Sequence, residues 1–274
     1  MDKLTYISAR REAVNLDGDL AWSGTASGVR GRAWTYKLGR RGVTGISLDA
    51  AKGELETTFL DEAVADRLRR IADKDLRDRT PGTLVVAGEW RRTCYVVASE
   101  PSSIFAGAHR EKLVLALLGS GWKRSRLHSF PVREEQASEG GYDFAHDWGL
   151  DFMRGPAPRF LDGGDLGESD FRLVVYGPAT NPAVTIAGNV YALKLDIPAG
   201  GHAIVDSTDC TIVSVAPGGA VSNAFGAGIR GAGKGGGRYI FQPIPEGVSD
   251  VAASGAFGFD LTVYETESEP PWSA

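Results

Sequence analysis

Short apolar runs, separated by polar and glycine residues, dominate the first half of the sequence. Runs of this length that are rich in β-branched and aromatic residues are typical of β-strands. The pattern predicts strands at 5–9, 33–38, 55–60, 83–87, 93–98 and 112–118. The run at 112–118 is also compatible with a short helix, but its small length and the glycine that follows it favour a strand.

One segment of the first half has helical spacing instead. Val64, Leu68 and Ile71 lie at i, i+4 and i+7, so they share one face of a helix. Asp61 or Thr58 is the expected N-cap, and the Thr-Pro-Gly sequence at 80–82 ends the segment. We expect its cationic residues to form a solvated face, with an interaction surface as the alternative; they are Arg67, Arg69, Arg70 and Lys74.

The second half is β-rich throughout. Strands are predicted at 171–176, 184–187, 190–195, 203–206, 211–215, 238–241 and 256–264. Gly188-Asn189, between the second and third of these runs, has the composition of a two-residue hairpin turn. Short strands at this spacing indicate a β-sandwich, of jelly-roll or similar type.

The two halves are separated by a polar, glycine-containing run at 133–141, where a domain boundary is expected. The fold class that follows is mainly β. We expect an N-terminal α+β domain with one helix at 1–131, a linker at 132–168, and a C-terminal β-sandwich at 169–274.

Composition narrows the functional classes. The net charge of −5 and the pI of about 5.5 give no reason to expect a nucleic-acid partner. The 36 glycines are spread without a three-residue period, which fits many turns and excludes collagen. The two cysteines, Cys94 and Cys210, form no disulfide framework, and Cys94 is expected to be buried. We expect neither a signal peptide nor a membrane span.

A glycine-rich stretch at 226–237 contains Gly-x-Gly-x-x-Gly and nearly a P-loop. A P-loop requires Ser or Thr after its lysine, but Gly235 follows Lys234, and the further glycines disfavour the helix that both motifs open. A mobile loop between two strands is expected instead. Because Arg230, Lys234 and Arg238 have no acidic residue between them, this loop is a candidate to face a lumen or a neighbouring subunit.

No motif for catalysis or cofactor binding emerges. The histidines lack the spacing of a zinc site, and no Gly-x-Ser-x-Gly pentapeptide occurs. His146-Asp147 beside Asp143 and Asp151 could hold a metal or form a base–orienter pair, but a polar linker is the simpler interpretation. We therefore expect no catalytic, metal or cofactor-binding residues and no enzymatic activity.

Four stretches of the linker and the C-terminal half resemble the phage distal tail protein family, also called siphovirus-type tail component. The segment 142–148 is similar to the family's Tyr/Asp-rich "YDYPYDY" linker, and 171–182 to its "yGpa-x-NP" strand and turn. Val205-Asp206-Ser207 matches an "ID-S/T" strand end, and 268–272 the terminal "RSEPxW", with Glu267 in place of the arginine. The resemblance covers about half of the chain, and the order of the motifs makes it specific.

This resemblance implies a structural protein. Its N-terminal domain would form a ring, usually a homo-hexamer, around a channel, and its C-terminal domain would be a galectin-like β-sandwich. The ring would join the tail tube protein to the tail tip, with the tail-associated fibre or lysin protein and the tape-measure protein as further partners and DNA passing only through the channel. The protein would reside at the virion tail tip after assembly in the host cytoplasm, without a membrane partner.

A second hypothesis is a carbohydrate-binding module for host adsorption. Sugar rings stack on exposed aromatic side chains, and Trp148 or Trp272 could serve that purpose. Because both lie in the linker or the tail, packing is the simpler role for each.

Overall fold

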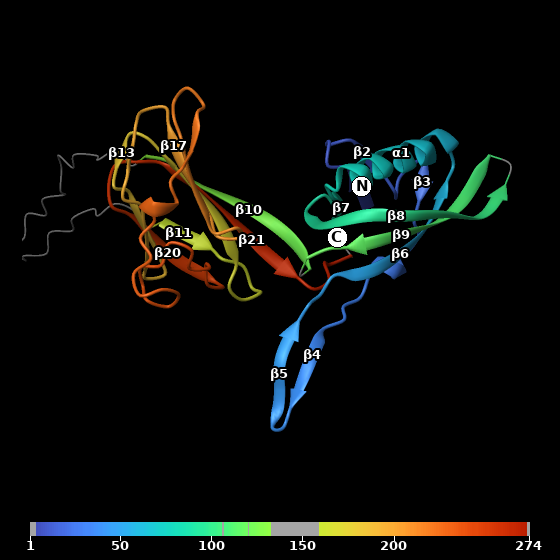
Figure 1. Cartoon of the computed structure of the whole chain (residues 1–274), viewed down its shortest axis with the longest axis horizontal. Coiled ribbons are helices and arrows are strands. Elements are labelled where there is room, and N and C mark those ends of the chain that lie inside the picture. The colour runs from blue at the N-terminus through green and yellow to red at the C-terminus, as the bar shows by residue number, and fades with distance from the viewer. Residues whose placement is uncertain (1–3, 106, 120, 133–158, 273–274) are drawn as a thin grey trace, which may run out of the picture. The chain divides into compact units, whose positions relative to one another are not determined.

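The computed structural model describes residues 4–105, 107–119, 121–132 and 159–272. They form two compact units, which we call unit 1 (Met1–Arg124 with Thr266–Ala274) and unit 2 (Ser125–Glu265). The chain passes between them within strands β10 (Trp122–Phe130) and β21 (Phe259–Glu267) (Figure 1). The predicted mainly β class is confirmed, with one α-helix among the described residues. The expected limits at 131 and 168 stay a prediction, because most of the linker lies outside those residues.

Unit 1 is built on an antiparallel sheet. Its strands pair in the order β2-β1-β7-β8-β9-β6-β3. Their bounds are β1 Leu4–Ile7, β2 Ala13–Asn15, β3 Ala21–Trp22, β6 Ala51–Phe59, β7 Gly82–Val86, β8 Trp90–Phe105 and β9 Ala108–Leu117. Alternate residues of β6 and β9 are buried, as expected for strands with one covered face. The strand interpretation of 112–118 is confirmed, and Cys94 is fully buried.

The predicted helix is α1 (Glu62–Asp78). Leu68 and Ile71 are buried in the unit 1 core, and Val64 packs against it. Asp61 is the N-cap, since its Oδ1 accepts a hydrogen bond of 2.9 Å from the Ala63 amide. Arg79 ends the helix in the left-handed conformation, and its amide bonds back to carbonyls of the last turn.

Replacing Asp61 by alanine is expected to destabilise unit 1 by about 1 kcal/mol, because the cap would leave an amide of the first turn without its side-chain acceptor. Asp73→Ala is the matched control, since Asp73 is an exposed aspartate within the same helix. Urea unfolding followed by circular dichroism measures both. Equal losses in the two variants would contradict the capping role.

A buried carboxylate attaches α1 to the sheet. Asp75 accepts a 2.6 Å hydrogen bond from the Tyr6 hydroxyl of β1 and a 3.2 Å bond from the Ala9 amide. Burial, together with the Asp75 carboxylate, raises the pKa of Tyr6 above its ordinary value. The hydroxyl therefore stays protonated and keeps donating to Asp75.

Unit 2 is a β-sandwich. One sheet runs β19-β18-β17-β12-β21 and the other β11-β20-β14-β15, all antiparallel. Residues from both sheets share one core that includes Phe171, Leu173, Val205, Leu161, Val184 and Tyr191. The bounds are β11 Arg159–Asp162, β12 Asp170–Tyr176, β13 Ala179–Thr180, β14 Ala183–Ile186, β15 Asn189–Ala192, β16 Asp196–Ile197, β17 His202–Asp206, β18 Thr211–Val215, β19 Val221–Asn223 and β20 Val248–Ala253.

Two local predictions in unit 2 were wrong. The two-residue turn between β14 and β15 is Ala187-Gly188, not Gly188-Asn189, because Asn189 already pairs with Ile186. The run 238–241 is no strand: Ile240 and Phe241 are buried in a loop. The side chain of Asn189 bonds the Tyr239 backbone of this loop: it accepts from the Tyr239 amide at 3.2 Å and donates to the Tyr239 carbonyl at 3.1 Å.

Candidate functional site

The glycine-rich loop of unit 2 is tied to β15. The Ile229 amide donates to Ala192 and the Val190 amide to Gly237, and the Lys194 amide donates to Ala227. In the described residues that follow the loop, the next element is the strand β20 and not a helix. The stretch therefore offers no helix N-terminus to a phosphate, in agreement with its sequence.

The three cations of this loop have different surroundings. Lys234 pairs with Glu168 at 2.8 Å, and Arg230 lies over the Phe225 ring and donates to the Phe225 carbonyl. Arg238 is exposed. Glu168 is 66 residues from Lys234 in the sequence, so local inspection could not find this partner. Whether the loop faces a lumen or a neighbouring subunit stays a prediction.

The residues considered for metal or sugar binding are accounted for only in part. Asp143, His146, Asp147, Trp148 and Asp151 lie outside the described residues. Within the described residues, no group of three or more His, Cys, Asp or Glu side chains could hold a metal ion. Trp272 packs edge-on against Trp122 at 6.1 Å with Arg30 over its ring at 4.5 Å, which agrees with a packing role for this side chain.

The described helices include none long and apolar enough to cross a bilayer.

An apolar pocket of about 500 Å³ lies in unit 2. Its wall contains Phe130, Phe257 and Phe259, all of them buried, and Phe130 stacks on Phe259 at 4.7 Å. The Tyr176 hydroxyl donates to Asp260 at 2.7 Å beside these rings. Packing therefore takes up the three phenylalanine rings, whereas Tyr176 in the same wall is 40% exposed.

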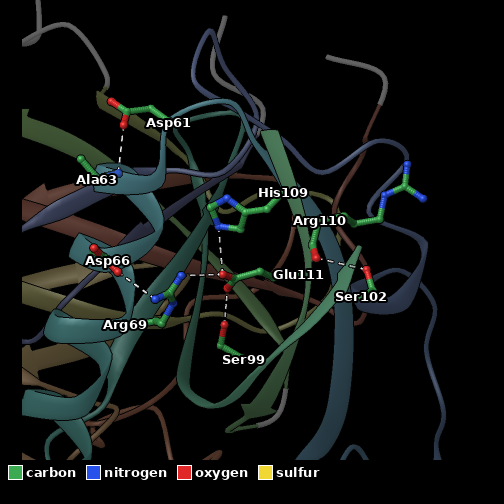
Figure 2. A network of polar contacts seen from close by, with 9 residues as sticks. All are labelled: Asp61, Ala63, Asp66, Arg69, Ser99, Ser102, His109, Arg110 and Glu111. Atoms are coloured by element: carbon green, nitrogen blue, oxygen red, sulfur yellow. Dashed lines mark hydrogen bonds and ion pairs between the residues drawn. The ribbon is translucent and has the colours of Figure 1, made fainter. Parts of the chain in front are cut away.

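Unit 1 contains a network around the buried carboxylate of Glu111 (Figure 2). Arg69 of α1 reaches Oε1 at 2.7 Å, His109 of β9 lies 3.0 Å from the same oxygen, and Ser99 of β8 donates to Oε2. Burial raises the pKa of Glu111, but the hydrogen bonds from Ser99 and Arg69 outweigh it and hold this pKa below its ordinary value. Because Arg69 lies on α1 whereas Ser99 and His109 lie on strands, the network clamps the helix to the sheet. Ser99 and His109 contact different carboxylate oxygens, which is not the arrangement of a nucleophile–base pair.

Sequence reasoning missed Glu111, although a signal was present. Glu111 lies in phase with Leu113 and Leu115, so the alternation of β9 already placed a carboxylate on the buried face.

The depressed pKa of Glu111 makes stability depend on pH. A carboxyl whose pKa is lower in the folded state contributes fully above its ordinary pKa of 4.5, and this contribution is lost as the pH falls through the folded pKa. We expect the urea concentration at the unfolding midpoint to decrease as the pH drops below 4.5. In Glu111→Gln this decrease should be smaller. Glu56→Gln, at an exposed position of β6, serves as the control. An unchanged pH profile in Glu111→Gln would contradict this role.

The strongest candidate surface is a hairpin of unit 1, formed by β4 (Thr35–Gly39) and β5 (Gly42–Ser47), which we call the arm. Figure 1 shows that the arm projects from the start of β6, and its strands pair only with each other in the described sheets. Tyr36 lies opposite Ile46, and Leu38 opposite Val43. All four side chains are at least half exposed, at 60%, 64%, 74% and 52% respectively.

Comparison with known proteins shows the fold to which this architecture belongs. The chain is similar to the crystal structure of SPP1 Dit, described as a paradigm of the hub adsorption apparatus in phages that infect Gram-positive bacteria: TM-score 0.56, 10% identity, 96% of this chain and 99% of that chain covered. It is also similar to a chain of the phage P2 baseplate in its activated conformation with Ca, with TM-score 0.57, 9% identity, and 98% and 99% coverage. The same baseplate with Sr gives the same values.

No protein-family model matches the sequence, and no curated protein matches it either. The likeness is therefore one of fold, and at this level the resemblance to distal tail proteins predicted from the sequence is confirmed.

Proposed function

We propose that this protein is a structural hub protein of a long-tailed phage or prophage, which links the tail tube to the tail-tip or baseplate proteins. The observation that carries the proposal is the fold match over almost the whole length of both SPP1 Dit and this chain. Support from the sequence is independent of this match, since four motifs in the family's order occur at 142–148, 171–182, 205–207 and 268–272.

In this proposal, copies of unit 1 form a closed ring, a homo-hexamer, around a channel through which DNA passes. Rings use head-to-tail interfaces, in which two different surfaces of one subunit meet. The tail tube protein, the tape-measure protein and the tail-associated fibre or lysin protein are the further partners. The sandwich of unit 2 is galectin-like, and the protein acts without catalysis at the tip of a virion tail that assembles in the host cytoplasm.

Deletion of the gene from the parent phage or prophage tests this function. Without the hub, the tail tube cannot be joined to the tail-tip proteins. Electron microscopy of the lysate should therefore show capsids without complete tails. Supplying the chain from a plasmid should restore them. Intact, infectious tailed particles after deletion would overturn the proposal.

A further inference from the structure

The arm has one apolar face and one polar face. Tyr36 and Leu38 are two residues apart on β4, and each lies opposite an apolar residue of β5. A register shift between Lys37 and Leu38 brings Val43 opposite Leu38, so the four side chains share one face. Thr35, Lys37 and Ser47 belong to the other face. An isolated two-stranded hairpin is only marginally stable in water, and an exposed apolar surface of this kind marks an interaction site.

The arm is also strongly basic. Residues 35–47 carry three cations and no carboxylate, namely Lys37, Arg40 and Arg41. Because the whole chain has a net charge of −5, the remainder carries −8. A second copy of this chain therefore offers the arm an oppositely charged body.

A complementary patch lies elsewhere on unit 1, where β3 meets the end of β6. The Leu60 amide donates to the Leu20 carbonyl, and Trp22 pairs with Thr58, so Leu20, Trp22 and Leu60 share the outer face. Their exposed fractions are 51%, 59% and 53%. Three exposed acidic residues adjoin them in the sequence: Asp19, Asp61 and Glu62. We call this surface the edge patch.

We propose that the arm of one copy docks on the edge patch of the next copy. The apolar face of the arm would cover Leu20, Trp22 and Leu60, while Arg40 and Arg41 at its tip would meet the acidic residues beside them. Both surfaces are exposed within one copy, so the arm does not cover its own patch. Two different surfaces meet in this contact, as a closed ring requires, so the inference rests on the proposed ring and names its interface.

Complementary charge reversals test the contact on the full-length protein. The arm variant is Arg40→Glu/Arg41→Glu, and the patch variant is Asp19→Lys/Glu62→Lys. All four residues are exposed, and thermal melting checks that each variant folds. Arg172→Glu/Lys194→Glu is the control for the arm variant, because it makes the same change in net charge at exposed positions of unit 2 outside the glycine-rich loop.

Native mass by light scattering across a concentration series is the readout. Each reversed variant alone should shift toward monomer, with the association constant reduced by roughly 100-fold or more, because like charges then meet at the interface. An equimolar mixture should reassemble, since each variant's arm then faces an oppositely charged patch. A neutral change to the apolar face, Leu38→Ser/Ile46→Ser, should also weaken association, and the control should not.

Assembly that is unchanged in both reversed variants would overturn this interface and leave the proposed ring intact. Loss of assembly without recovery in the mixture would also overturn it. A wild-type protein that stays monomeric at every concentration would rule out a second copy as the occupant, while the gene deletion tests the hub function separately. Binding of a DNA oligonucleotide that the arm variant abolishes, with unchanged mass, would assign the arm to nucleic acid instead.

Discussion

Phe171→Ala is expected to reduce the free energy of unfolding of unit 2 by about 3–5 kcal/mol, the usual range for a fully buried aromatic residue. Phe171 is 0% exposed on the central strand β12, and Tyr191 packs edge-on against it at 5.2 Å across the sandwich. The truncation removes apolar contacts from both sheets and leaves a cavity that strands on either side cannot fill.

Phe160→Ala is the matched control for this prediction. Phe160 also lies on a strand of unit 2, but it is 59% exposed, so its loss should change stability by no more than about 0.5 kcal/mol. Urea unfolding followed by circular dichroism gives both values. If Phe171→Ala were no more harmful than Phe160→Ala, the assignment of a shared sandwich core would be wrong.

Glu111→Ala should be the most damaging polar substitution in unit 1, with an expected loss of about 2–3 kcal/mol. The change removes the carboxylate that accepts from Arg69 and Ser99 and lies 3.0 Å from His109 Nε2. The Ser99 hydroxyl then loses its buried acceptor, whereas Arg69 keeps Asp66 at 2.8 Å and is 41% exposed, which limits the effect.

Glu54→Ala provides the comparison for Glu111→Ala. Glu54 also lies on a strand and binds Lys52 and Lys112, but its side chain is 41% exposed. Ion pairs in solvent contribute little, so we expect little change in the unfolding midpoint. The clamp would be contradicted if loss of Glu111 left the melting temperature unchanged, or if both variants were equally destabilised.

Elements defined by local pattern could be predicted from the sequence. The spacing of Leu68 and Ile71 identified α1, and Asp61 identified its start. The strands around Cys94 and Leu173 followed from their apolar alternation. Such patterns work because a helix or strand with one buried face must repeat with its own period.

Features that depend on distant residues could not be predicted. The run 238–241 has the composition of a strand, but Tyr239 bonds the side chain of Asn189, 50 residues earlier, and Ile240 bonds Ile229 in the glycine-rich loop. The β14–β15 turn falls one residue earlier than predicted, because Asn189 pairs with Ile186 as part of β15 and leaves Ala187 and Gly188 in the turn.

The arm illustrates the same limit for the candidate site. The sequence predicted a strand at 33–38, but β5 contains glycines and small residues and was not recognised. Only the pairing of Tyr36 with Ile46 and of Leu38 with Val43 shows that one face of the hairpin is apolar. Its exposure depends on what else packs nearby, which alternation alone does not reveal.

The central claim, a hub position at the end of a tail, is tested most directly by immunogold electron microscopy of tailed particles from the parent phage or induced prophage, using antibodies against the purified chain. We expect gold at the distal tip of the tail, one cluster per particle. Tails without gold, or gold distributed along the tube, would contradict it.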